Sequence, residues 1–460
     1  MATLALILAF GLGGWLLARD CIRRTTLGWA LWIPTILVMA LGSRSPSEWL
    51  AIGSAWQESN SGNALDHVFF LGLTIGAVLV LISRRMRWSK LCALNFVLLL
   101  FYLYFAVSIS WADNGDASFR RWFKDAGFLF VAVLILSEKD PLTAMRAVYI
   151  RAACVLLPLS VVCCRYYPQV SRSFAIDGTQ ELSGVAIDKN HLGESVMVMG
   201  LFLCWDYLET RSKGAPRRWN WDALILALLG SWLLWISNSK TAFACMLIGL
   251  TLLLFRRGRL ASSKIIGRSL LLGALSLPFL VLLTQEFRTT LGPVLAMLGR
   301  DATFTGRTAI WEHITFETVD PITGAGFWNF WGEKRGLAII RAMNTPIPEA
   351  HNGYLDIYLD GGFIGLGLLF LLLLRGGNRF MQGQRSALRF RYALLIVVIV
   401  YNLAESLFAR PSVLWFTTLL ILIDVPERNL LRAFPNYLAR WRPELLGPQL
   451  RLHGVSQPGD

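Results

Sequence analysis

Charged residues are scarce in this chain. Only 16% of its 460 residues are Asp, Glu, Lys or Arg, whereas soluble proteins carry about 25%. Hydrophobic residues make up 55% of the chain, and its mean hydropathy is +0.51. This balance excludes an ordinary soluble protein and favours a protein with many membrane spans.

Cysteine and histidine are also sparse, with seven Cys and five His. The cysteines lie mostly within or beside apolar segments, and two of them, Cys163 and Cys164, are adjacent. They show neither the spacing of metal ligands nor that of a disulfide framework. We therefore expect them to be packing residues, and we expect no bound metal and no cofactor.

Apolar runs recur along the chain at about the 17 to 25 residues that cross a bilayer as a helix. They predict an all-α polytopic membrane protein with about 12–13 transmembrane helices. The expected spans are 2–18, 28–42, 68–83, 91–109, 126–137, 147–164, 192–208, 222–237, 241–255, 269–285, 353–374, 392–409 and 411–425.

The absence of linkers and repeats indicates one membrane domain with four regions. These are N-terminal transmembrane helices (1–285), a large outside loop with short amphipathic helices (286–352), C-terminal transmembrane helices (353–425) and a basic inside tail (426–460). The N-terminus has no basic segment before its first apolar run. It therefore predicts an uncleaved first span rather than a signal peptide.

The net charge of +14 would suit a nucleic-acid partner, but the distribution of Lys and Arg does not. They are concentrated in short segments between alternate spans, such as "SRRMRWSK" (83–90) and "RSKGAPRR" (211–218). Basic loops of this kind face the cytoplasm and contact anionic lipids. The pattern places the N-terminus outside and predicts membrane lipids, not nucleic acid, as the partner.

The longest segment between expected spans, 286–352, lies on the outside. Within it, "TGRTAIWEHITFETV" predicts a short amphipathic helix capped near Thr305. "DPITGAGFWNFWG" then breaks the helix, and its aromatic residues suit the lipid headgroup level. A loop this long either has a function or is disordered, and its apolar content argues against disorder.

Several cations lie on the outside face, where the positive-inside rule does not explain them. They include Lys189, Lys240, Arg307, Arg335 and Arg341. A single Lys beside a span usually extends to the membrane surface, which is the alternative for each of them. Several cations at one depth would instead bind a multiply charged anion such as a phosphate.

The stretch "EAHNGYLDIYLDGGFIGLGLL" (349–369) places charge at the start of an apolar span. His351 is either a helix cap or a catalytic residue. Asp356 and Asp360 would share one face of a helix, where they would contact partners or water. Favourable interaction with the helix dipole is the alternative for Asp356. The Gly361–Gly362 pair predicts close helix approach or a local break.

Three stretches together resemble the O-antigen ligase and polymerase family of bacterial envelope glycosyltransferases. His351-Asn352 precedes Gly362-x-x-Gly365 by nine residues. "GRTAIWEHITFETVDPITGAGFWNFW" is similar to the family's opening of the large periplasmic loop, and "GVAIDKNHLGESV" is similar to its Lys-Asn-x-x-Gly element.

The resemblance implies a metal-independent, inverting glycosyltransferase with a GT-C-like helical bundle in the bacterial inner membrane. Its donor would be an undecaprenyl-diphosphate-linked oligosaccharide, and its acceptor a glycan or lipid-linked glycan, both handled on the periplasmic face. By the same resemblance, His351 would be the essential histidine and Arg307 the loop arginine. Lys240 would replace an arginine, which keeps the charge but loses the planar fork.

These residues suggest how the site would work. Arg307 and Lys240, with Lys189, would stabilise the charge that develops on the diphosphate. His351 would be either a general base or a diphosphate ligand. Further substrate contacts are expected from Asn352, Asp356, Arg335 and Trp328, with orientation of His351 as the alternative role of Asp356.

Within the family, two activities remain open. A polymerase joins repeat units on one lipid carrier, and a ligase moves the finished chain to another acceptor such as lipid A-core. "GFWNFW" and "SWADNGDASFRR" slightly favour an exopolysaccharide-type polymerase. A transporter or flippase for the same lipid would more often show repeats and interrupted helices at midplane. A structural scaffold would leave the outside cations unexplained.

Overall fold

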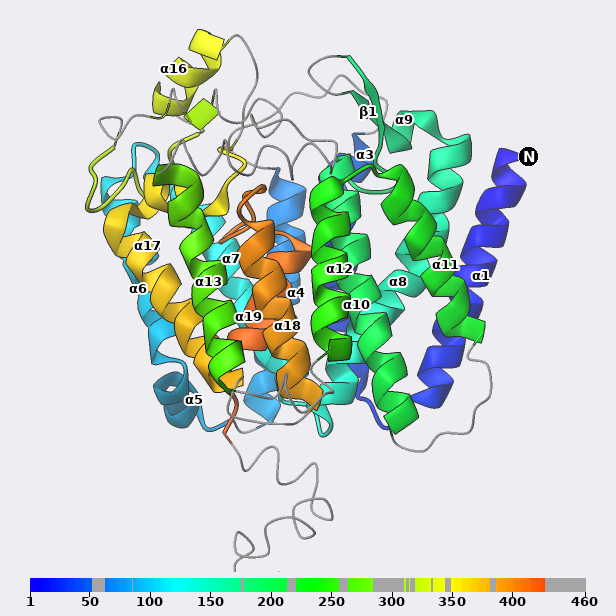
Figure 1. Cartoon of the computed structure of the whole chain (residues 1–460). Helices are drawn as coiled ribbons and strands as arrows, with labels where there is room; N and C mark the ends of the chain where they lie inside the picture. The colour runs from blue at the N-terminus through cyan, green and yellow to red at the C-terminus, as the bar shows by residue number, and fades with distance from the viewer. Residues whose placement is uncertain are drawn as a thin grey trace, which may run out of the picture.

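The computed structural model is built mainly of helices (Figure 1). It describes residues 1–51, 63–84, 86–174, 178–212, 221–255, 264–283, 310–311, 314, 319–331, 334–343, 349–380 and 386–426. In the first half, the helices are α1 (Ala2–Arg23), η1 (Trp29–Leu31), α2 (Trp32–Leu41), α3 (Pro46–Leu50), α4 (Ala64–Ser83), α5 (Trp88–Leu94), α6 (Phe96–Ser108), η2 (Ile109–Trp111), α7 (Gly115–Leu136), α8 (Pro141–Tyr166) and α9 (Pro168–Ser171).

The second half continues with α10 (Lys189–Ser212), α11 (Trp221–Ile236), α12 (Lys240–Phe255), α13 (Lys264–Leu283), α16 (Lys334–Met343), α17 (Gly353–Phe380), α18 (Ser386–Tyr401) and α19 (Val413–Leu422). Among the residues that the structure describes, the all-α prediction missed a two-stranded hairpin. Its strands β1 (Arg172–Phe174) and β2 (Gln180–Leu182) pair antiparallel, with Ser173 opposite Glu181.

Four of the described helices, α1, α4, α8 and α17, are long and apolar enough to cross a membrane. The pair α5 and α6, bent by 86°, makes a fifth if it forms one span. The chain is therefore a polytopic membrane protein, as its composition predicts. The larger number of 12–13 spans and the GT-C-like arrangement stay predictions.

Several expected helix boundaries were wrong. α18 ends at Tyr401 rather than at 409. α7 begins at Gly115 rather than near 126. The polar side chains of Arg120, Arg121 and Lys124 therefore lie on its first turns rather than in a loop. Asn114 explains the early start, because its side-chain oxygen accepts a hydrogen bond from Ala117 N–H (3.1 Å) and caps the helix.

The helices at the centre of the bundle are buried on all sides, whereas the outer ones expose apolar side chains. Every residue of α19 is buried, and α18 lies beside it (Figure 1). At the periphery of the bundle, α1 exposes Leu4, Ile7 and Leu8, and α11 exposes Trp235. An apolar surface of this kind belongs in contact with lipid.

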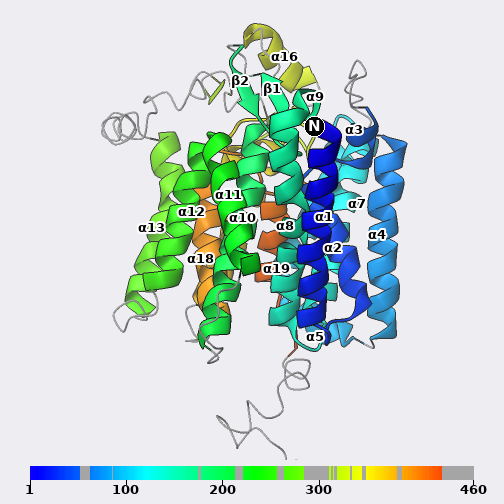
Figure 2. The ribbon, with the colours of Figure 1, turned by 90° about the vertical axis from the view of Figure 1, so that its right-hand side faces the viewer.

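α16 and the β-hairpin lie at one end of the bundle, which we call the α16 end (Figures 1 and 2). The N-terminus lies at the same end, whereas α5 lies at the opposite end. This agrees with the predicted topology, in which the N-terminus and the large loop share one side of the membrane.

α17 is broken at Gly362, whose φ of 61° and ψ of −162° are not helical. The glycine-rich segment 320–326 packs into the break, and a Cβ on Gly362 would clash with the Ile322 carbonyl oxygen. Backbone N–H donors and carbonyl acceptors are paired as Ala325–Leu359 (2.8 Å), Gly326–Asp360 (2.9 Å) and Phe363–Pro321 (2.9 Å). The local break expected at Gly361–Gly362 is confirmed, and it attaches the large loop to the membrane helix.

Candidate active site

The starts of α10 and α12 lie against each other at the α16 end. Ser239, directly before Lys240, donates from its hydroxyl to Asn190 Oδ1 (3.3 Å). A Cβ on Gly193 would lie 2.7 Å from Ser239 Cβ, so this close approach requires glycine. The sequence elements that contain Lys189 and Lys240 are therefore neighbours.

The start of α17 is held by the connection between α18 and α19. Gly353 N–H donates to the carbonyl oxygens of Asn402 (2.9 Å) and Glu405 (3.0 Å). Tyr401, at the end of α18, donates from its hydroxyl to the Asn190 carbonyl (3.3 Å). The α18–α19 connection therefore lies between the His351 segment and the α10 start.

Asn352 caps α17. Its side-chain oxygen accepts from Tyr354 N–H (3.1 Å) and Leu355 N–H (3.2 Å), and its own N–H donates to Ser406 Oγ (2.9 Å). Asn352 is fully buried. These contacts give it a structural role, and its expected contact with substrate stays a prediction.

Three helix N-termini, those of α10, α12 and α17, are thus brought to the same end of the bundle. Each contributes partial positive charge from its aligned peptide dipoles. Helix N-termini of this kind favour bound anions, phosphates in particular. Lys189 and Lys240 add full positive charges at two of them.

His351 is ion-paired with two carboxylates. Its Nδ1 lies 2.9 Å from Glu349 Oε1 and 3.5 Å from Glu405 Oε2. Glu405 is only 4% exposed. Burial alone would lower the pKa of His351, but the two glutamates outweigh it and raise that pKa to about 10. The two carboxylates therefore favour the charged form of the imidazole.

The ligand atoms of Glu349, His351 and Glu405 lie within 4.8 Å of one another, a spacing that a metal ion also requires. Metal binding needs the neutral ring, so a metal here would replace the proton on His351. The three side chains could therefore form an ion-paired group or hold a metal ion. Metal independence of the reaction stays a prediction.

Backbone strain is concentrated around these segments. Among the described residues, four that are not glycine have positive φ: Asn238 (50°), Trp328 (52°), His351 (50°) and Ala409 (54°). They lie beside Ser239, in the GFWNFW segment, at the start of α17 and in the α18–α19 connection. Such conformations cost roughly 1–3 kcal/mol each and cluster at functional sites.

Asp356 of α17 contacts three other parts of the chain: the GFWNFW segment, the residue before His351 and the α18–α19 connection. It is 3% exposed, and its carboxylate accepts from Trp331 Nε1 (2.7 Å) and Ala350 N–H (3.2 Å) and pairs with Arg410 Nη2 (3.3 Å). It shares a buried face with Asp360, as the helical spacing predicts. Its expected contact with substrate stays a prediction.

The sequence suggested that the aromatic residues of the GFWNFW segment lie exposed at the headgroup level. For three of them this was wrong. Phe327, Phe330 and Trp331 are buried because they fill the space between the loop and the membrane helices. Phe327, for example, packs edge-on against Phe105 of α6 with a centroid distance of 5.3 Å. These three residues are core, and they do not cover a lipid.

Trp328 is half-buried and contacts two guanidinium groups. Arg410 lies 4.5 Å and Arg121 5.4 Å from its ring centroid. Arg121 also donates to the Trp328 carbonyl (2.5 Å). These contacts fix the position of the ring, and its stacking on substrate stays a prediction.

The cations expected from the sequence differ in their partners and exposure, and one of them lies outside the described residues. Lys189 pairs with Glu181 of β2, and Lys240 is an exposed residue at the first position of α12. Arg335 pairs with Asp113 (2.9 Å), which joins α16 to the α6–α7 connection. Arg307 lies outside the described residues, as does most of the helix expected after Thr305.

Sequence reasoning missed Glu349, Glu405 and Arg410. None lies in a recognisable motif, and Glu405 falls inside the expected span 392–409. A charged residue within a span usually has a function, so that position was itself a signal. Arg410 occupies the single position between two expected spans.

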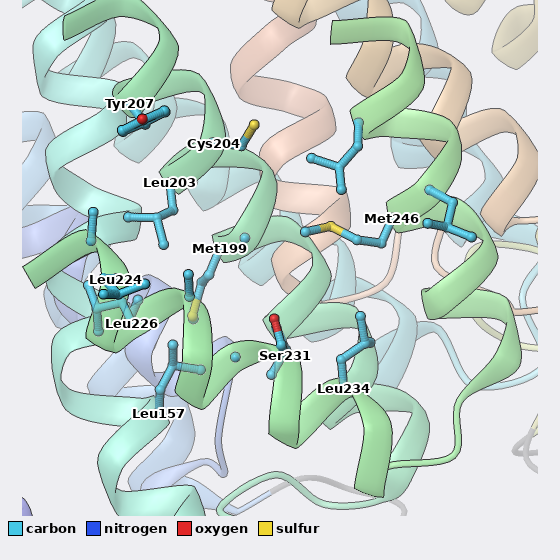
Figure 3. Close-up of a pocket in the computed structure, with 18 of the residues that line it drawn as sticks. Leu157, Met199, Leu203, Cys204, Tyr207, Leu224, Leu226, Ser231, Leu234 and Met246 are labelled. Atoms are coloured by element: carbon cyan, nitrogen blue, oxygen red, sulfur yellow. The ribbon is translucent and has the colours of Figure 1, made fainter. Parts of the chain in front are cut away.

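A separate cavity of about 750 Å³ lies between α8, α10, α11 and α12 (Figure 3). Its lining is largely apolar and includes Leu157, Val196, Met199, Leu234 and Met246. None of the site residues above lines it. On α10 it begins at Val196, about 10 Å along the helix axis from Lys189 at 1.5 Å per residue.

Comparison with known proteins gives two matches. Residues 225–370 match the family model described as O-antigen ligase. This region contains Lys240, Arg307 and His351, whereas Lys189, Glu405 and Arg410 lie outside it. No solved structure matches the chain.

The exopolysaccharide production protein ExoQ of Rhizobium meliloti (strain 1021) is 23% identical over 279 residues. The match covers 59% of this chain and 62% of that protein, so the chain spans less than two thirds of its relative. Together with the motifs, these matches confirm the resemblance. Residues 225–370 of this chain are thus similar to the O-antigen ligase family.

Proposed function

We propose that this chain is an inner-membrane glycosyltransferase that uses undecaprenyl-diphosphate-linked oligosaccharide on the periplasmic face. The observation that best supports this is that the starts of α10, α12 and α17, which carry Lys189, Lys240 and His351, lie at one end of the bundle. A multiply charged anion is the ligand that such a cluster favours.

The reaction is transfer of a sugar chain with inversion. An acceptor hydroxyl attacks the anomeric carbon of the donor, and the bond from this carbon to the diphosphate oxygen breaks. The bonding electron pair leaves on the diphosphate, whose growing negative charge is stabilised by Lys189, Lys240 and Arg307. Fixed cations aimed at developing charge are usually a large catalytic contribution.

The ion-paired state of His351 favours one of its two expected roles. A protonated imidazole cannot accept a proton, so His351 donates to the diphosphate rather than acting as the general base. The acceptor proton then passes to a carboxylate of the cluster. Glu349 suits this role better than Glu405, because its side chain is 23% exposed against 5%.

The apolar cavity between α8, α10, α11 and α12 supports a lipid-linked donor. It lies on α10 and α12, the helices that begin with Lys189 and Lys240 (Figure 3). A polyprenyl chain in this cavity would have its diphosphate at the α16 end. Arg335 and Trp328 then lie on the loop side of the site, where sugars would bind.

Of the two activities, polymerisation is the one we propose, with exopolysaccharide as the polymer. The printed name of the relative, an exopolysaccharide production protein, and the "GFWNFW" and "SWADNGDASFRR" segments support it. Transfer of a finished glycan to lipid A-core or another acceptor is the alternative.

Reconstitution into liposomes with a purified lipid-linked repeat unit tests the proposal. A polymerase converts the single repeat into a ladder of longer chains on the same lipid. A ligase instead leaves the repeat unpolymerised until a separate acceptor is added. Movement of the lipid across the bilayer without any new glycosidic bond would refute both and identify a flippase.

A further inference from the structure

His191 forms a second histidine–carboxylate pair at the α10 start. Its Nδ1 lies 2.7 Å from Asp188 Oδ2, and its side chain is 34% exposed. It directly follows Asn190, which contacts both Ser239 and Tyr401. His191 therefore lies where the Lys240 segment, α10 and α18 meet.

Hydrogen bonds fix the Asp188 carboxylate in a position where it binds the His191 ring. One of its oxygens accepts from the N–H groups of Asn190 (2.8 Å) and His191 (2.9 Å), and the other binds the imidazole. Burial would raise the pKa of Asp188, but the charge of His191 and these hydrogen bonds hold that pKa well below its usual range. The carboxylate is therefore ionised and fixes Nδ1–H toward itself.

The second ring nitrogen is left for another partner. Nε2 lies on the far side of the imidazole from Asp188, and in the described part of the chain no hydrogen bond engages it. Glu194 and Glu349 act electrostatically on His191, so its surroundings favour the charged ring. Glu349 is also a partner of His351, which places the two histidines in one electrostatic environment.

We propose that His191 is a further substrate-contacting residue, whose Nε2–H donates to the diphosphate of the lipid-linked donor, with Asp188 as its positioning residue. This rests on the proposed function. Lys189 and Lys240 place positive charge at the starts of α10 and α12. The His191 ring, held by the Asp188 carboxylate, adds a hydrogen-bond donor with a fixed direction. Diphosphate has more oxygens to satisfy than a monophosphate, so His191 discriminates between these headgroups.

Binding of undecaprenyl diphosphate and undecaprenyl phosphate to the purified full chain in detergent tests this. His191→Gln should weaken diphosphate binding roughly tenfold, because a hydrogen bond to a charged group is lost. Binding of the monophosphate should change less than threefold. His67→Gln, in the first turn of α4, is the matched control and should bind both lipids as the wild type does.

Asp188→Asn separates positioning from helix capping. Asparagine caps helices about as well as aspartate, so the unfolding temperature should stay near that of the wild type. Diphosphate affinity should still fall severalfold, since the ring loses its charged partner. Suppose instead that His191→Gln and Asp188→Asn both lower the unfolding temperature and leave the preference for diphosphate unchanged. That result would show a purely structural role and overturn the proposal.

The same experiment distinguishes failure of the inference from failure of the proposed function. If the wild type and His67→Gln bind diphosphate and His191→Gln binds it equally well, only the role of His191 is wrong. If the wild type binds no polyprenyl diphosphate, the proposed function itself is wrong.

Discussion

At the scale of single residues, the charge of His351 decides how the proposed site would work. Two glutamates from different parts of the chain surround its Nδ1, and one of them, Glu405, is buried. A lone histidine near its ordinary pKa of about 6.5 would be a fitting base. The two carboxylates favour its charged form, which would suit the contact with a diphosphate that we propose.

The pH dependence of catalysis follows from this. The pKa of His351 is raised to about 10, so its charged form is present at neutral pH and is lost as pH rises through that value. We expect kcat/KM to show no rise that depends on His351 between about pH 6 and 8, and to fall toward pH 10. The substitution Glu405→Gln removes one of the two carboxylates that raise the pKa of His351. The fall in kcat/KM should therefore begin at lower pH in this variant.

Steady-state pH profiles of the wild type and Glu405→Gln measure this directly. A kcat/KM that increases through the ordinary histidine range, with the same midpoint in the two proteins, would instead identify His351 as a general base.

Arg410 is the second residue whose effect is predicted at this scale. Arg410→Ala leaves the carboxylate of Asp356, only 3% exposed, without its cation and removes a contact with Trp328. We expect a loss of about 3 kcal/mol, since breaking a buried pair strands its partner. Thermal unfolding in detergent measures it.

Arg410→Lys is the matched control for that substitution. It keeps the charge near Asp356 and should retain most of the stability, while the planar stacking on Trp328 is lost. Equal unfolding temperatures for Arg410→Ala and the wild type would show that the pair with Asp356 contributes nothing.

At the scale of elements, the break in α17 joins the large loop to the membrane helices. Segment 320–326 supplies backbone partners to the groups that the break releases. Only glycine suits position 362, because its φ is positive and because any Cβ there would collide with the Ile322 carbonyl group. The loop is therefore positioned by the same residues that lead from His351 into the membrane.

Two glycine substitutions in α17 test this attachment. Gly362→Ala should destabilise the protein by several kcal/mol, since strain of roughly 1–3 kcal/mol adds to a backbone clash. Gly367→Ala should be neutral or slightly stabilising, because a Cβ there meets nothing within 4 Å and alanine favours helix. Similar unfolding temperatures for the two variants would contradict this account of the break.

The elements also show what sequence can and cannot predict here. The break at Gly361–Gly362 and the short connection before Lys240 were predictable, because glycine and chain length constrain them locally. The ion pair of His351 with Glu405 was not. It depends on how α18 packs beside α17, and no local pattern encodes a contact between segments 54 residues apart.

At the scale of the whole molecule, those site residues that the structure describes gather at one end of the bundle. The N-terminus, the β-hairpin and α16 lie at this end, and α5 lies at the other (Figure 1). The charge pattern of the sequence predicts that the α16 end lies outside the cytoplasm. The apolar cavity lies between the two ends, within the helices.

Cysteine labelling of intact cells tests this orientation. Gln180→Cys, exposed in β2, should react with a membrane-impermeant maleimide added from outside. The natural Cys92, exposed in α5, should react only after the inner membrane is opened. Labelling in the reverse order would invert the topology and place the site in the cytoplasm.

The most direct test of the central claim is turnover of lipid-linked oligosaccharide by the reconstituted protein and its His351→Ala and Arg307→Ala variants. We predict that each variant is folded and loses at least about 100-fold in kcat, because it lacks a cation that stabilises the leaving diphosphate. Normal turnover by both folded variants would contradict a diphosphate site at the α16 end.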